Sequence, residues 1–267
     1  MEFLDYGFMQ RALLAGFIIA IVCPLIGSFL FLKRLSMIGD ALAHISMAGI
    51  ATGLIIGVNP IVSALAITML ASLVIDYLRK HFKKYDEISI AIIMAAGLGM
   101  GIILITIGGS DTANVVSYLF GSIIAISPSD LFLIAIISSV VLLITILMYN
   151  KLFYITFDEE SAKIRGIHVD RINIIFILLT AMTIVVSIKV TGILLVSSLI
   201  TIPVATGFQL ARSFRHTVLF SIFFAQLNVL LGLICSFYLD WPPGGTIIIT
   251  SLIILFLVIG LKQLSRC

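Results

Sequence analysis

Asp40 and His44 stand four residues apart in an otherwise apolar stretch, RLSMIGDALAHISMAGIA, at residues 34–51. Residues four apart share one face of a helix, so both side chains can reach the same point. A carboxylate together with an imidazole suits Zn²⁺, Mn²⁺ or Fe²⁺. Three interpretations follow, namely a transient cation site, a structural Asp–His hydrogen bond that locks two helices, and a proton relay.

The pair differs from the other acids and histidines of the chain. Of 13 acids, only Asp40 and Asp76 fall within apolar spans, and only His44 does so among four histidines. Asp76 stands three residues before Arg79, where an ion pair at the helix end explains it. Ionisable groups kept inside a membrane helix are functional by default. Two ligands are too few for a tight site, which suits a pathway that the ion must leave again.

The composition identifies the protein class. The 267 residues are 61% apolar and 11% charged, with a mean hydropathy of +1.26, whereas a soluble domain has about 25% charged residues. We therefore expect an all-α integral membrane protein, a bundle of about eight or nine transmembrane helices forming one domain over residues 1–267. A span needs about 20 mostly apolar residues, and the candidates are 10–32, 37–57, 60–78, 88–108, 131–149, 172–190, 192–210, 217–237 and 246–261.

The basic residues predict the orientation, because cytoplasmic loops carry the excess of Lys and Arg. With the N-terminus outside and the C-terminus inside, only Arg11 and Lys189 of the 16 basic residues lie outside. The Gly/Ser-rich residues 109–130 are too short in their apolar middle to span, so they form a re-entrant or interfacial segment.

Two spans contain residues that shape helices. Pro203 lies within 192–210 and predicts a helix kink, because proline removes a backbone hydrogen bond. Gly97, Gly99 and Gly101 lie within 88–108 and permit close helix approach.

The longest inner loop, at about residues 150–171, contains DEESAKIR at 158–165. Acids in the first turn and bases in the last predict a short helix, and Gly166 is a natural stop. Such a helix suits docking to a cytosolic partner, although a solvated connector between spans explains the same residues.

Several motifs are missing from the chain. It has no G-x-x-x-x-G-K-[ST] phosphate loop, no H-E-x-x-H and no G-x-S-x-G, and no basic-aromatic patch. We therefore expect a transport subunit rather than an enzyme, with no nucleotide site and no nucleic-acid partner.

Five motifs in order resemble the membrane permease subunit of the zinc/manganese (chelated-iron) family of ABC importers. They are RLSMIGDALAHISMAGIA at 34–51, SYLFGSIIAISPSDL at 117–131, FDEESAKIRGI at 157–167, TGILLVSSLITIPVATGFQLARS at 191–213 and DWPPGGTIIITS at 240–251. The resemblance implies the ABC importer permease fold, a helical bundle related to the vitamin B12-type permeases, in the cytoplasmic membrane of a prokaryote.

The resemblance also implies partners and roles. Such permeases are homodimers embedded in membrane lipid, with two cytosolic ATP-binding subunits beneath and an extracellular metal-binding protein above. ATP binds only the partner subunits, no cofactor is bound permanently, and the transported ion is Zn²⁺, Mn²⁺ or Fe²⁺. Asp40 and His44 match the family's acid and histidine on the metal path. The coupling helix corresponds to Asp158, Glu159, Glu160, Ala162 and Gly166.

The residues around His44 favour the zinc branch of that family. Manganese-type members tend to have Ser-His-Ala-Val-Leu-Pro-Gly, whereas this chain has AHISMAG, with Ala43 before the histidine and Ala48 at the proline position. Manganese and iron remain alternatives. A different class, a proton-coupled secondary metal transporter, would use Asp40 and His44 as its relay.

Overall fold

The computed structural model describes residues 6–82, 86–109, 117–122 and 126–264, and these form an all-helical bundle without strands, as predicted. Each long helix is an apolar run whose backbone polar groups are satisfied internally, as a lipid environment requires. The labelled helices are α1 (Gly7–Leu32), α2 (Met37–Ile56), α3 (Pro60–His81), α4 (Asp86–Gly108), α6 (Pro128–Phe157), α7 (Glu159–Ile164), α8 (Val169–Thr191), α9 (Val196–Leu210), α10 (Phe214–Leu239) and α11 (Pro243–Leu264).

Within the described residues, eight helices are long and apolar enough to cross a membrane. The ninth candidate, 192–210, is shorter than predicted, because α8 stops at Gly192 (φ +82°) and α9 begins only at Val196. Its 15 residues span roughly 22 Å, less than the hydrocarbon thickness of about 30 Å. Pro203 is buried inside α9, and the kink assigned to it stays a prediction.

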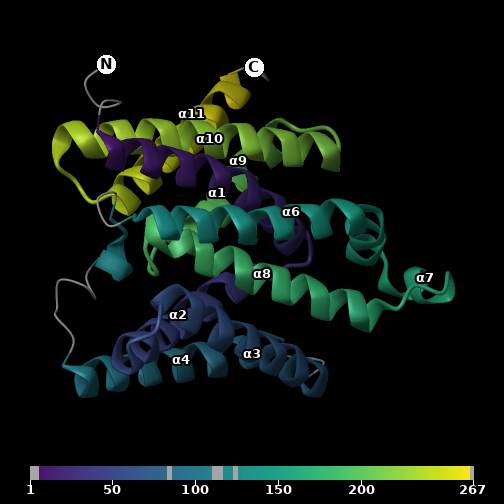
Figure 1. The fold of residues 1–267 in the computed structure, drawn as a ribbon. Coiled ribbons are helices and arrows are strands. Elements are labelled where there is room, and N and C mark those ends of the chain that lie inside the picture. Colours follow the sequence, from purple (N-terminus) through teal and green to yellow (C-terminus); the bar gives the residue numbers. More distant parts are fainter. Residues whose placement is uncertain (1–5, 83–85, 110–116, 123–125, 265–267) are drawn as a thin grey trace.

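The helices pack in three layers (Figure 1). The first layer holds α1, α9, α10 and α11, the second holds α6 and α8, and the third holds α2, α3 and α4. The most apolar stretch of α1 is 78% buried and that of α4 only 17%. The helices α1, α2 and α8 therefore form the centre, and α4 and α11 the rim.

Two of the three predicted glycines of α4 allow close packing. A Cβ on Gly97 would collide with Ile45 of α2, and one on Gly101 would lie 3.1 Å from Met47. Nothing lies within 4 Å of a Cβ on Gly99. The expectation was wrong for Gly99, because positions 97 and 101 share a helix face that position 99 does not.

The short helix α7 projects from one end of the bundle, which we call the α7 end (Figure 1). Asp76, the second acid within a span, lies towards this end of α3 and pairs with Lys80 at 2.8 Å. Lys80 also lies 3.4 Å from Asp170 at the start of α8. The predicted ion pair at the helix end is thus present, with Lys80 as a partner.

At the opposite end, two basic side chains hold the stretch that precedes α6. Arg11 donates from Nε to the Ile126 carbonyl oxygen at 2.9 Å. The Lys189 ammonium lies 3.3 Å from Asp130, and both side chains are nearly buried. These are the two basic residues that the predicted orientation places outside. Residues 126–130 are thereby fixed to α1 and α8. The Tyr118 carbonyl oxygen accepts from the Ile193 N–H at 2.9 Å. Residues 110–116 and 123–125 of the predicted re-entrant segment lie outside the described residues.

Candidate metal site and coupling helix

Asp40 and His44 lie near the α7 end of α2, with Asp40 in its first turn and His44 one turn deeper. The helix packs against α3, α4, α8 and α9. From Ile38 to Ala51 every residue is buried except these two, which are partly exposed. Between Ile38 and Ala51 the chain therefore covers α2 except at the face that carries the acid and the imidazole.

His44 has an unusual polar environment. Its Nδ1 atom is buried and has no hydrogen-bond partner among the described residues. A buried polar atom without a partner costs about 1–3 kcal/mol. An imidazole nitrogen shielded from water and left unpaired fits a site that binds a transient ligand.

Asp40 and His44 are two candidate metal ligands on α2. Across the described ranges, no three His, Cys, Asp or Glu side chains come together as metal ligands. The carboxylate of Asp40 and the ring of His44 are the two groups that α2 places on one face.

The short helix predicted at 158–165 is present as α7, Glu159–Ile164. Asp158 caps its start by accepting from the Ser161 backbone N–H at 2.9 Å and from the Ser161 hydroxyl. The hydroxyl bond, followed by the backbone bond, lowers the pKa of Asp158. Gly166, at φ +76°, ends the helix and donates its N–H to the Lys163 carbonyl oxygen at 3.0 Å.

The two faces of α7 differ sharply. Ala162 is buried, and α7 contacts both α6 and α8. Glu160 and Lys163 are exposed, and Ile164 is 87% exposed, the highest value among the large apolar side chains of the described residues. The face of α7 that carries Glu160, Lys163 and Ile164 is therefore open to solvent.

Replacing Gly166 with Ala is expected to loosen α7. Nothing lies within 4 Å of the added Cβ, so the whole effect comes from the left-handed backbone, about 1–2 kcal/mol. Amide hydrogen exchange at 159–167 should therefore accelerate about 5- to 30-fold, measured by mass spectrometry. Gly57→Ala is the matched control, since Gly57 has φ +77° and equally open surroundings at the other end of α2. Unchanged exchange in α7 would refute the strain at Gly166.

Three residues of this region were missed by the motif analysis. Lys33 was counted only as an inner basic residue, and Asn173 and Ile164 were not singled out. The structure brings Lys33 and Asn173 to Glu159 at the start of α7. The sequence around α7 predicts the helix itself through its capping residues. It gives no sign of the contacts with Lys33 and Asn173, because these residues lie far from α7 in the chain.

A polytopic helical bundle with an acid–imidazole pair on a central helix and a short capped helix at one end fits a transporter permease. The model of the ABC 3 transport family matches residues 5–262. The chain belongs to this family, and the predicted resemblance to metal-importing ABC permeases is confirmed.

Relatives in other organisms carry names that refer to metals. The chain is 40% identical to a probable metal transport system membrane protein of Treponema pallidum, covering 98% of each protein. It is 28% identical to the manganese transport system membrane protein MntC of Listeria innocua, over 95% of this chain and 90% of that protein. It is 29% identical to the high-affinity zinc uptake system membrane protein ZnuB of Haemophilus influenzae, over 90% and 92%.

A solved structure has the same fold. The structure of PsaBC from Streptococcus pneumoniae in complex with Fab superposes with a TM-score of 0.87 at 26% identity, covering 96% of this chain and 94% of that one. The ABC importer permease fold expected from the sequence is therefore confirmed.

Proposed function

We propose that this chain is the permease subunit of an ATP-driven importer for a divalent transition metal, with zinc favoured. The observation that carries the proposal is the Asp40–His44 face of α2, the uncovered side of a central helix. His44 Nδ1 has no hydrogen-bond partner among the described residues, so no internal bond through this atom fixes the imidazole ring. Among the described residues, this atom therefore gives no support to a structural Asp–His hydrogen bond.

The metal site is proposed to form between two copies of the chain. Each copy brings one carboxylate and one imidazole, so a homodimer brings four ligands, the number that zinc prefers in proteins. A site shared across a subunit interface can open when the subunits move apart, which allows release. Imidazole favours zinc over manganese, and relatives are named for each metal.

The exposed face of α7 is proposed to dock on a separate cytosolic ATPase, one for each permease, as the coupling helix. Asp158, Glu159, Glu160 and Gly166 shape and cap this helix, and Ala162 anchors it to the bundle. ATP then binds only the partner, and this chain is a transport subunit without enzyme activity of its own. An extracellular metal-binding protein would deliver the ion at the opposite end.

The proposed orientation places the α7 end in the cytoplasm and the N-terminus outside, in the cytoplasmic membrane of a prokaryote. The basic residues support it, because Lys33, Lys80 and Lys163 lie at the α7 end. At the opposite end, Arg11 and Lys189 are both engaged in contacts within the chain.

Reconstitution tests the proposal directly. In proteoliposomes that contain the chain with its ATPase, we expect ⁶⁵Zn uptake that requires ATP and the metal-binding protein. We also expect unlabelled zinc to compete with this uptake better than manganese does. The chain alone should move no metal. Uptake by the chain alone under a pH gradient would overturn the proposal in favour of a proton-coupled secondary transporter. If manganese competed more strongly than zinc, the importer function would stand and the transported metal would be manganese.

A further inference from the structure

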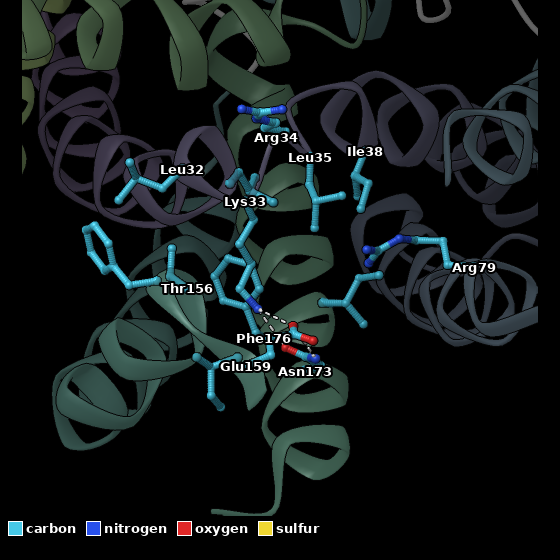
Figure 2. A pocket seen from close by; sticks show the side chains of 14 residues that line it. Leu32, Lys33, Arg34, Leu35, Ile38, Arg79, Thr156, Glu159, Asn173 and Phe176 are labelled. Atoms are coloured by element: carbon cyan, nitrogen blue, oxygen red, sulfur yellow. Dashed lines mark hydrogen bonds and ion pairs between the residues drawn. The ribbon is translucent and has the colours of Figure 1, made fainter. Parts of the chain in front are cut away.

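A cavity of about 370 Å³ lies where α7 meets the bundle (Figure 2). It joins the turn between α1 and α2 to the start of α7 and to the first half of α8. Its polar lining includes Lys33, Arg34, Arg79, Glu159 and Asn173.

Three of these side chains form a closed set of contacts. Lys33 donates from Nζ to Asn173 Oδ1 at 2.7 Å and lies 3.9 Å from Glu159 Oε1. Asn173 donates from Nδ2 to the same Glu159 oxygen at 3.3 Å. Figure 2 shows the Lys33 side chain extending across the cavity towards these two partners. We call this set the Lys33 contact.

Lys33 is the buried member of the set. Its side chain is 9% exposed, whereas that of Glu159 is 50% exposed. Burial lowers the pKa of Lys33 to about 8, and the negative charge of Glu159 opposes this shift. An ammonium group out of water requires its partners, since removing one partner of a buried pair is strongly destabilising. The Lys33 charge is therefore sensitive to the position of Glu159.

Lys33 is also closely connected to the metal-site helix. It caps the end of α1 and stands four residues before the start of α2 at Met37. The turn between them is tight, with Arg34 at φ +58° and the Leu35 N–H donating to the Leu30 carbonyl oxygen at 2.9 Å. Asp40 follows in the first turn of α2. Because this turn is tight, a displacement of Lys33 is expected to shift the start of α2, which carries Asp40.

We propose that Lys33 is a positioning residue that transmits movement of α7 to the start of α2, and so links the ATPase to the metal site. The inference rests on the proposed function, because the proposed ATPase is what moves α7. Glu159 is the first residue of the docking helix, so a shift of that helix changes the Lys33 contact directly.

The test measures metal uptake per ATP hydrolysed in proteoliposomes that contain the permease and its ATPase. Lys33→Met keeps the apolar stem and removes the ammonium. Coupling between sites commonly corresponds to a factor of about 5–150, and we expect uptake per ATP to fall about tenfold while ATP hydrolysis stays within about twofold. Glu159→Gln breaks the same contact from its half-exposed side, and provides the test if Lys33→Met does not assemble.

Controls separate positioning from a purely structural role. The double variant should be no worse than either single variant, because both remove one contact. Lys151→Met is the matched control, an exposed lysine at the α7 end of α6, and should behave as wild type. If the Lys33 contact were purely structural, Lys33→Met would lower the thermal unfolding midpoint or the yield of the complex. Uptake per ATP would then be unchanged, which would overturn the inference.

The pH profile provides a second readout. Below pH 8 Lys33 is charged and paired, and above it the ammonium loses its proton and the contact weakens. The charged groups that shift its pKa are Glu159 of α7 and Arg79 and Asp76 of α3, and the ordinary pKa values of these residue types lie outside pH 7–9. Uptake per ATP should therefore fall in the wild type as pH rises from 7 to 9, but not in Lys33→Met.

The outcomes are distinguishable. If the wild type moves no metal with its ATPase, the proposed function fails and the inference fails with it. If the wild type transports and Lys33→Met has the same uptake per ATP and the same pH profile, only the inference on Lys33 is overturned. Independent, additive losses from Lys33→Met and Glu159→Gln would also overturn it.

Discussion

Asp40→Asn and His44→Gln are each expected to reduce metal uptake at least about 100-fold. Loss of a group that only orients a metal ligand already costs about 10–100-fold in metal affinity or activity, and these substitutions remove a ligand itself. In a symmetric dimer each substitution removes two of the four proposed ligands. The variants should still assemble with the ATPase, because both side chains lie on the face of α2 that the chain leaves uncovered.

The measurement is ATP-dependent ⁶⁵Zn uptake at matched protein levels, with the amount of co-purified ATPase as the assembly check. Asp240→Asn is the matched acid control, since Asp240 lies in a left-handed turn (φ +52°) that Asn tolerates. His81→Gln is the matched histidine control, because His81 is exposed at the end of α3. Normal uptake in Asp40→Asn and His44→Gln would show that the pair has a structural role and does not bind the metal.

Ile164→Asp is expected to weaken association with the ATPase at least about 30-fold. Burying an isoleucine stabilises a complex by about 2 kcal/mol, which corresponds to that factor. The introduced carboxylate adds a desolvation penalty. The fold should be unaffected, because Ile164 is 87% exposed and contributes little to the core.

Association is measured by titrating detergent-solubilised permease with purified ATPase. Leu264→Asp is the control, an equally apolar side chain that is 75% exposed at the end of α11, away from α7. We expect it to bind the ATPase like the wild type. Equal affinity for Ile164→Asp and the wild type would show that the partner does not cover this face of α7.

Local features of the chain were predictable from the sequence. The helix α7 follows from its acidic first turn, its basic last turn and Gly166, because the helix dipole and caps act within one or two turns. The shared face of Asp40 and His44 follows from helix periodicity. The membrane class follows from composition, because 11% charged residues are too few to cover the surface of a soluble domain.

Contacts between distant segments required the tertiary structure. Lys33, Glu159 and Asn173 lie on three elements, and no spacing rule joins them. The packing of Gly97 and Gly101, but not Gly99, depended on which face of α4 meets α2. Sequence by itself determined the membrane class, the shared face of Asp40 and His44 and the short helix α7, because these rest on local chemistry. Only the tertiary structure decided which side of α2 stays uncovered and what ties α7 to it, because burial is a property of the packed bundle.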